Sequence, residues 1–447
     1  MEIISKAYAP VLKVLKRFQK RTAQGRWMKY CVRENVEDGI LIHNLMTREL
    51  LLLTEAEAQD PTALDYLWER WFVVPAQTNE KELVDFLRII LENSRGKNQN
   101  ITDYTIYTTT DCNARCFYCF QHGTAKINMT LETAEKVVRF IRNHCGGKKV
   151  RIQWFGGEPL LNVPVIDTIC AGLHQAGLDF ESNLTTNGYL LSDEIVRKAA
   201  EVWNVNRVQV ALDGTEKVYN RAKAYVDVEG SPYQVVLENM GRLQDAGITV
   251  VVRLNLDLYN AGDLMNLVDD LGNRFAGHGD IRIYVAHLFR QDQPMADLHT
   301  PAGWNKREQA LNSVEMRIAQ WGMTLKQGIR KILTSYQCKA DCGSYVTITP
   351  TGHVGVCEHY TDSEFVGHVD RDQFDPEMVA SWQESLPAYP ECADCCHYPE
   401  CKRLKKCPEN KCFDQARAKL LRDKQRMMRN EYGMWKEQET AFEDEDD

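Results

Sequence analysis

Short apolar stretches alternate with segments of helical apolar spacing through the middle of the chain. The apolar stretches are rich in β-branched and aromatic residues, which predicts six strands at 104–110, 150–155, 181–187, 207–213, 250–257 and 281–288. Segments between them, such as 130–145 and 192–203, repeat apolar residues every three or four positions and predict amphipathic helices. Strands that alternate with helices predict a parallel α/β sheet. Six such units are too few for a closed eight-fold barrel, so we expect a partial (β/α)6 barrel over residues 100–330.

The pattern at the beginning of the chain is different. Residues 38–54 predict two short strands joined by a turn, and Thr54 and Glu57 have the spacing of a capping box that starts a helix. Helical apolar spacing follows at 62–71 and 80–94. Helices beside a small β-wing predict a winged-helix-like module.

We place this module at residues 1–95. Winged-helix modules commonly bind DNA, but the segment has no obvious basic recognition helix. The wing at residues 40–53 has an expected open strand edge, which could accept an extended peptide as an additional strand.

Charge and hydropathy narrow the class of protein. The chain has 447 residues, with 54 basic and 63 acidic side chains and a net charge of −9, which disfavours a general binder of nucleic acid or of membrane surfaces. It contains no apolar run of about 18 residues and no signal-peptide pattern at its start. We therefore expect a cytoplasmic protein with no membrane span.

Cysteine is the residue type with an unusual distribution. In the cytoplasm the 15 cysteines are not expected to form disulfides. Cys31, Cys145 and Cys170 are scattered, as is typical of small buried apolar residues. Three others lie at 112–119 and nine at 338–412, and such groups predict metal sites. A charged amphipathic helix and an acidic tail are expected at 416–447.

The first group has the spacing Cys112-x3-Cys116-x2-Cys119 and directly follows the first predicted strand of the barrel. Three thiolates could hold zinc together with a distant fourth ligand. They could also hold three irons of a 4Fe-4S cluster, which leaves the fourth iron open to a small molecule. This loop resembles the hallmark of the radical S-adenosylmethionine superfamily, including the aromatic Tyr118 before the last cysteine.

Other strand ends carry further parts of that resemblance. It implies that Gly156, Gly157 and Glu158 hold the amino group of S-adenosylmethionine. It also implies that Thr186 and Asn187 contact the ribose. The remaining S-adenosylmethionine contacts implied are Asp213, Arg221, which would pair with the methionine carboxylate, and Asn255, which would reach the adenosine.

The second group of cysteines resembles the SPASM domain, expected here at residues 331–415. The resemblance implies two auxiliary 4Fe-4S clusters. The first would take Cys338, Cys342, Cys357 and Cys407, and the second Cys392, Cys395, Cys401 and Cys412. The spacing before Cys407 is irregular, and Cys396 is a ninth thiol that could be a ligand, a spare or a substrate contact. A zinc-ribbon-like domain is the structural alternative.

Together, the three segments resemble maturases of ribosomally made peptides, of the ranthipeptide and sactipeptide type. In that group an amino-terminal module, the RiPP recognition element, binds the leader of a precursor peptide. The resemblance implies a radical enzyme that forms thioether cross-links and takes electrons from a flavodoxin- or ferredoxin-type donor. Carbon–carbon or carbon–oxygen cross-linking, epimerisation and formylglycine formation remain as alternatives within enzymes. An iron–sulfur electron carrier and a winged-helix redox regulator remain as alternatives outside peptide modification.

Overall fold

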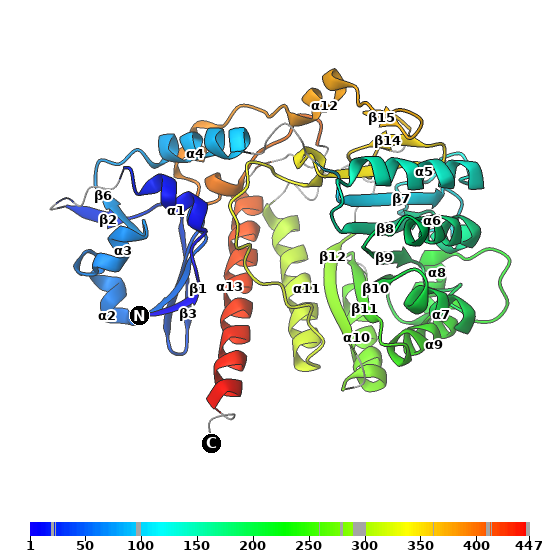
Figure 1. Ribbon diagram of the computed structural model, residues 1–447. Helices are drawn as coiled ribbons and strands as arrows, with labels where there is room; N and C mark the ends of the chain where they lie inside the picture. Colours follow the sequence, from blue (N-terminus) through cyan, green and yellow to red (C-terminus); the bar gives the residue numbers. More distant parts are fainter. Residues whose placement is uncertain are drawn as a thin grey trace. The chain divides into compact units, whose positions relative to one another are not determined.

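The computed structural model describes most of the chain (Figure 1). The described residues are 1–18, 22, 24–94, 100–258, 260–277, 280–288, 301–360, 362–407, 412 and 414–443. They form two compact units. The first unit comprises Met1–Asn98, Lys326–Asp341 and Ser381–Asp447, and the second comprises Gln99–Leu325 and Cys342–Ala380.

The second unit is built on a nine-stranded sheet. Six parallel strands lie in the order β12-β11-β10-β9-β8-β7. Their bounds are β7 Asp103–Thr109, β8 Val150–Gly156, β9 Phe180–Thr186, β10 Val205–Leu212, β11 Thr249–Leu256 and β12 Ile281–His287. All six predicted strands and the partial barrel are therefore confirmed.

Three short strands extend this sheet beyond β7. β13 (Tyr345–Ile348) pairs with β7 in parallel, and β14 (His353–Gly355) and β15 (Gly367–His368) add antiparallel strands. They belong to the cysteine-rich segment, for which no strand was predicted from the sequence.

Helices connect the parallel strands, as the apolar spacing predicted. They are α5 Leu131–His144, α6 Val163–Gln175, α7 Asp193–Glu201, α8 Glu216–Lys223, α9 Pro232–Asp245, α10 Ala261–Phe275 and α11 Pro301–Gln320. α12 (Pro376–Gln383) follows β15. Since β7–β12 are parallel, the loops that follow them gather at one edge of the sheet (Figure 1).

The first unit contains a four-stranded antiparallel sheet in the order β1-β5-β4-β3. The strands are β1 Glu2–Ser5, β3 Cys31–Val36, β4 Gly39–Asn44 and β5 Leu50–Leu53, and β2 (Gly25–Trp27) pairs separately with β6 (Val73–Pro75). The helices around them are α1 Ala9–Leu15, α2 Glu55–Gln59, α3 Asp65–Glu69 and α4 Glu80–Ser94. The capping box of Thr54 and Glu57 is formed as predicted.

The prediction of an open strand edge at residues 40–53 is wrong. The predicted hairpin exists as β4 and β5, but β5 also pairs with β1, and β4 also pairs with β3. Both strands of the wing are therefore interior strands. The four residues of β1 are too few to show a periodic pattern in the sequence.

The long helix α13 (Asp414–Glu443) belongs to the same unit and packs on one face of this sheet. Met428 and Tyr432 of α13 are buried in a cluster with Val32 and Leu41. The Gln425 side-chain amide donates a hydrogen bond to the main-chain oxygen of Arg33 in β3, at 3.0 Å. Figure 1 shows α13 running beside β1 and β3. The opposite face of the sheet is covered by a second cluster that includes residues of α2 and α3.

The predicted carboxyl-terminal helix is thus confirmed, and the last acidic residues, 444–447, lie outside the described residues. In the described part of the chain we find no helix with the length and apolar character needed to cross a membrane.

Candidate functional site

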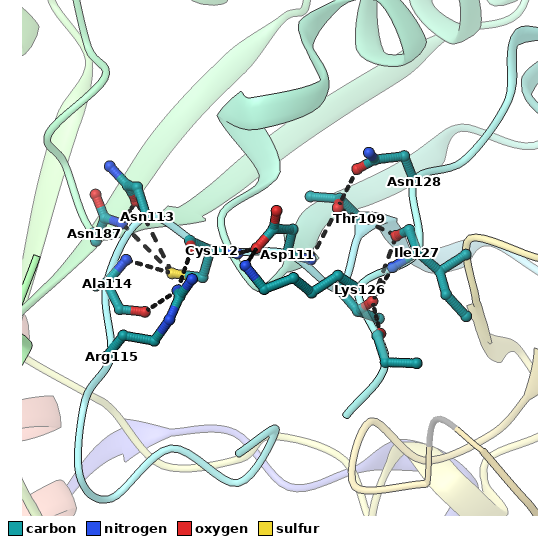
Figure 2. A network of polar contacts seen from close by, with 12 residues as sticks. Thr109, Asp111, Cys112, Asn113, Ala114, Arg115, Lys126, Ile127, Asn128 and Asn187 are labelled. Carbon is teal, nitrogen blue, oxygen red and sulfur yellow. Dashed lines mark hydrogen bonds and ion pairs between the residues drawn. The ribbon is translucent and has the colours of Figure 1, made fainter. Parts of the chain in front are cut away.

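The loop that carries Cys112, Cys116 and Cys119 begins directly after β7 and is fixed by polar contacts (Figure 2). Asp111 accepts a hydrogen bond from the Cys112 main-chain N–H at 2.8 Å and forms an ion pair with Lys126 at 2.8 Å. The main-chain N–H of Ala114 points at the Cys112 Sγ, at 3.4 Å. These contacts hold the first thiol of the loop in place.

The three thiols are free, partly buried and close enough to interact electrostatically. Burial raises the pKa of Cys112 to about 11, and the nearby Glu158, Cys116 and Cys119 add to the effect. Burial also raises the pKa of Cys116. Three partly buried thiols on one sheltered loop are a donor set that fits an iron–sulfur cluster or a metal ion, since the thiolate form binds these groups. No three His, Cys, Asp or Glu side chains among the described residues already surround a single ion position.

Glu158 lies at the end of β8 and is completely buried. It accepts hydrogen bonds from the Thr186 hydroxyl at 2.7 Å, from the Asn187 main-chain N–H at 2.7 Å and from the Leu160 main-chain N–H at 3.2 Å. Burial nevertheless raises the pKa of Glu158 to about 7. A carboxylate held this way is suited to receive a cationic group that replaces the missing solvent.

The two glycines before Glu158 allow a close approach of main chains. Gly156 has φ +139°, and a Cβ there would lie 2.2 Å from the Thr109 main-chain oxygen. At Gly157 a Cβ would lie 2.1 Å from the Asp111 main-chain oxygen. The resemblance implied that these glycines help to hold the amino group of S-adenosylmethionine, and the structure shows them packed on the start of the cysteine loop. They set the position of Glu158 relative to that loop.

Thr186 and Asn187, at the end of β9, complete this side of the site. The Thr186 hydroxyl donates to Glu158 and accepts a hydrogen bond from the Gly188 main-chain N–H at 3.0 Å. The Asn187 side-chain amide donates to the Asn113 Oδ1 at 2.6 Å, next to Cys112. Both residues therefore lie at Glu158 and the cysteine loop, and their contact with the ribose stays a prediction.

On the other side of the loop, Tyr118, Asp213 and Asn255 meet in a buried network. The Tyr118 hydroxyl donates to the Asp213 carboxylate at 2.8 Å. The Asn255 amide donates to the Asp213 Oδ1 at 2.9 Å and to the Tyr118 hydroxyl at 3.2 Å. The structure thus brings the three predicted residues together, and they form hydrogen bonds with one another.

A residue that the sequence reasoning missed, Lys223, joins this network. Its Nζ lies 2.9 Å from the Tyr118 hydroxyl and 3.2 Å from the Asp213 carboxylate, and its side chain is 5% exposed. Although burial lowers the pKa of Lys223, Asp213 and the other anionic neighbours outweigh it, so the pKa is raised. The available signal was helical spacing, since Tyr219, Ala222 and Lys223 form the buried face of α8.

A pocket of about 680 Å³ opens beside Tyr118 and Asp213. Phe117, Val218 and Leu288 give it apolar walls, and Arg221 of α8 lines it with an exposed side chain. Within the described residues Arg221 has no hydrogen-bond or ion-pair partner, so its guanidinium can bind an anion. The pocket volume is in the range of small-molecule and cofactor sites.

The first unit contains a second group of thiols. Electrostatic interactions connect the four cysteines proposed for one auxiliary cluster, which are Cys392, Cys395, Cys401 and Cys412. Cys338 and Cys407 of the same unit interact in the same way.

Cys342 and Cys357 belong to the second unit. The ninth thiol, Cys396, packs against the cluster that joins α13 to the sheet, and burial raises its pKa to about 11. This environment favours a small apolar role for Cys396.

Comparison with known proteins agrees with this geometry. The family model of the radical SAM superfamily matches residues 106–271, which include the cysteine loop and the ends of β7–β11. GTP 3′,8-cyclase of Clostridium perfringens is 35% identical over 281 residues, covering 58% of this chain and 81% of that protein. A probable GTP 3′,8-cyclase of Archaeoglobus fulgidus is 32% identical, covering 38% of this chain and 53% of that protein. Another curated relative, an uncharacterized protein of Methanocaldococcus jannaschii, is spanned over only 37% of its length.

Solved structures share the fold over more of the chain. anSMEcpe with bound AdoMet is 14% identical with a TM-score of 0.55, over 74% of this chain and 100% of that chain. SuiB of Streptococcus suis bound to the precursor peptide SuiA is 13% identical with a TM-score of 0.50, over 85% of this chain and 95% of that chain. With the family match, the cyclase relative and the loop after β7 taken together, the chain belongs to the radical SAM superfamily.

Proposed function

We propose that this protein is a radical S-adenosylmethionine enzyme that modifies a precursor peptide. The observation that carries the proposal is the edge of the sheet that bears three free thiols and the buried Glu158, with a pocket beside it that is lined by Tyr118, Asp213 and Arg221. A 4Fe-4S cluster and S-adenosylmethionine would supply the one-electron chemistry, a 5′-deoxyadenosyl radical that removes a hydrogen atom from the substrate.

The residues divide between two tasks. Cys112, Cys116 and Cys119 would hold the cluster, and Glu158 would receive the ammonium of S-adenosylmethionine. Arg221 would pair with its carboxylate, since a guanidinium binds a carboxylate in a bidentate manner.

The neighbouring polar residues would orient these groups. Thr186 and Asn187 hold Glu158 by hydrogen bonds and face the ribose side. Asp213 lines the pocket, and Asn255, which donates a hydrogen bond to Asp213, would reach the adenosine.

The auxiliary clusters form a separate part of the proposal. The electrostatic interaction among Cys392, Cys395, Cys401 and Cys412 supports one of them. For the cluster of Cys338, Cys342, Cys357 and Cys407, the resemblance to the SPASM domain is the support. Reconstituted protein should then hold about three 4Fe-4S clusters per chain. An iron content near four per chain would show that neither auxiliary cluster is present.

The peptide substrate is inferred from fold likeness and from a groove in the first unit. SuiB was solved with the precursor peptide SuiA, and anSMEcpe with the Cp18Cys peptide. The groove, of about 290 Å³, is lined by aromatic side chains that include Phe18, Trp68 and Phe86. Phe18 and Phe86 are 48% and 41% exposed, which is the character of a docking surface for an apolar peptide segment. Since both strands of the predicted wing are paired, side-chain insertion into this groove replaces strand addition at residues 40–53 as our proposal for leader binding.

For the product we propose a thioether. In that reaction an S–H and a C–H bond break and one S–C bond forms. The substrate would give up one hydrogen atom to the deoxyadenosyl radical, one proton to a base and one electron, for which an auxiliary cluster would be the acceptor. A flavodoxin- or ferredoxin-type protein would supply the electron that cleaves S-adenosylmethionine.

The test begins with a search of the neighbouring genes for a short open reading frame with repeated Cys, whose peptide is then incubated with the anaerobically reconstituted protein. The expected product is lighter by two hydrogens per cross-link and loses one alkylatable cysteine for each. The triple change of Cys112, Cys116 and Cys119 to Ala should abolish 5′-deoxyadenosine formation and leave the auxiliary clusters. A modified peptide that retains all its free cysteines would exclude thioether formation and favour a carbon-centred cross-link.

A second candidate is cyclisation of a nucleotide, and the 35% identity to the clostridial GTP 3′,8-cyclase favours it. Lys217 and Arg221 of α8 line the pocket and could bind phosphates. Incubation with GTP, S-adenosylmethionine and reductant distinguishes the two candidates, because only a cyclase consumes GTP as 5′-deoxyadenosine forms.

A further inference from the structure

Within the first unit, helix α4 contacts the cysteine-rich loop at residues 392–401 directly. Arg88 of α4 donates hydrogen bonds from its Nη2 to the main-chain oxygens of Tyr398 and Cys401, the second at 2.7 Å. Its guanidinium also lies over the ring of Tyr398, 4.4 Å from the centroid. One arginine therefore binds both ends of the short turn that leads into Cys401.

Tyr398 provides a second connection between α4 and this loop. Its hydroxyl donates a hydrogen bond to the Asp85 carboxylate at 2.5 Å. Asp85 also forms ion pairs with Lys81 at 2.6 Å and with Arg88 at 3.7 Å. Because these three charged residues are three or four positions apart, they lie on one face of α4. That face of the helix is the one that contacts the loop.

A buried ion pair fixes the residue that precedes Cys401. Arg48, in the turn between β4 and β5, has a completely buried side chain that lies 2.5 Å from the carboxylate of Glu400. Lys424 of α13 pairs with the same carboxylate at 2.6 Å. A buried guanidinium needs such partners in place of water, so this contact holds one geometry more firmly than a surface pair does. Cys401 is thus held by Arg88 at its own main chain and by Arg48 through its neighbour.

The amino-terminal segment also reaches the other cysteines of the loop. Cys392 packs against an apolar cluster that includes Leu87 of α4. Lys29 forms an ion pair at 2.5 Å with Asp394, which lies between Cys392 and Cys395. This last pair is exposed and contributes little by itself. Residues that orient the ligands of a metal group affect how firmly the group is held, and the contacts around α4 are of this kind.

We propose that Arg88 is a positioning residue for one auxiliary iron–sulfur cluster. The ligands of that cluster would be Cys392, Cys395, Cys401 and Cys412. The inference rests on the proposed function, because it needs an auxiliary cluster in the first unit. Helix α4 would then have two roles, since Phe86 on another of its faces lines the groove proposed for the leader peptide.

The test follows the loss of iron from reconstituted full-length protein in the presence of a chelator. Arg88→Met removes the hydrogen bonds to both main-chain oxygens, whereas Arg88→Lys keeps a charged donor. Arg70→Met is the matched control, because Arg70 also stacks on a tyrosine ring of the first unit, that of Tyr66. Released iron is measured over time, and the thiols that have become accessible are alkylated and identified by mass spectrometry.

In Arg88→Met we expect one cluster to lose its iron faster than in the wild type, by about tenfold or more, because hydrogen bonds from a charged donor are lost. Alkylation should appear first at the four thiols of the proposed auxiliary cluster, while the three thiols of the loop after β7 stay protected. Arg88→Lys should release this iron at an intermediate rate, and Arg70→Met at the wild-type rate. If Arg88→Met does not fold, the comparison of Arg88→Lys with the wild type and Arg70→Met decides in the same way.

Wild-type rates of iron release in the Arg88 variants overturn the proposal. An equal acceleration in Arg70→Met also overturns it, because the effect would then be a general loss of stability. If the four thiols of the wild-type protein are alkylated without chelator, there is no cluster for Arg88 to position. Formation of 5′-deoxyadenosine by that same protein would leave the proposed radical chemistry intact. A wild-type protein that keeps the auxiliary cluster but does not cleave S-adenosylmethionine refutes the proposed function alone.

Discussion

Glu158 should make the binding of S-adenosylmethionine depend on pH. The pKa of this buried carboxyl is about 7, so half of the protein molecules carry it protonated at neutral pH. The ammonium of the ligand favours the ionised form. The gain in affinity is therefore fully present above pH 7 and is lost as the pH falls through 7. Between pH 8 and pH 6 we expect the dissociation constant to rise by about tenfold, since one pH unit below the pKa corresponds to about 1.4 kcal/mol.

Glu158→Gln should remove this dependence. A hydrogen bond to a charged group contributes about 1.5–3 kcal/mol, so the variant should bind S-adenosylmethionine about 10- to 150-fold more weakly at pH 8. Glu158 now accepts hydrogen bonds from Leu160, Thr186 and Asn187, and the amide nitrogen of the variant would place a donor against one of these donors. The assay is equilibrium dialysis of labelled S-adenosylmethionine with anaerobically reconstituted protein from pH 6 to pH 8.

Glu181→Gln is the matched control, because Glu181 lies on β9 and pairs with Lys149 away from the cysteine loop. It should keep both the affinity and the pH profile of the wild type. If Glu158→Gln retains the wild-type pH profile, another group is responsible for it. A flat wild-type profile from pH 6 to pH 8 would contradict the assignment of the ammonium to Glu158.

Three further predictions concern the two units. Gly157→Ala should lose S-adenosylmethionine binding in the dialysis assay, because the added Cβ would displace the main chain at Asp111. Gly262→Ala in α10 is the control and should bind normally, since a Cβ there meets no atom within 4 Å. Cys395→Ala should lower the iron content by about one cluster, whereas Cys396→Ala should keep all iron and lower only the melting temperature; equal iron loss in both would make Cys396 a ligand. Phe86→Ser should weaken binding of the labelled precursor peptide, measured by fluorescence anisotropy, without changing the cleavage of S-adenosylmethionine in the absence of peptide. An unchanged affinity for the peptide would show that the groove does not bind the leader.

The sequence predicted the parallel strands and the cysteine loop because both signals are local. A buried strand can be recognised from an apolar stretch of seven or eight residues, and the motif that begins at Cys112 can be recognised from the spacing of its cysteines. The sequence also located Glu158, Thr186 and Asn187 at the correct strand ends, although not their hydrogen bonds to one another.

Contacts between segments that are far apart in the sequence could not be predicted in the same way. β1 is a strand because β5 provides a partner, and its four residues carry no period of their own. Helical spacing places Lys223 on the buried face of α8, but its buried charge depends on Asp213 in the preceding loop, and that pairing has no local signal. The steric role of Gly157 likewise depends on the main chain of Asp111, 46 positions earlier.

The packing of α13 on the sheet of β1, β3, β4 and β5 has a consequence for biosynthesis. The ribosome finishes β5 roughly 375 residues before it reaches Met428, and at about 5–20 residues per second this takes about 20–75 s. During that interval the apolar face formed by Val32, Leu41 and Leu52 has no permanent cover. The nascent sheet is thus a natural client for a chaperone, and its core cannot be complete before Met428 and Tyr432 have been synthesised.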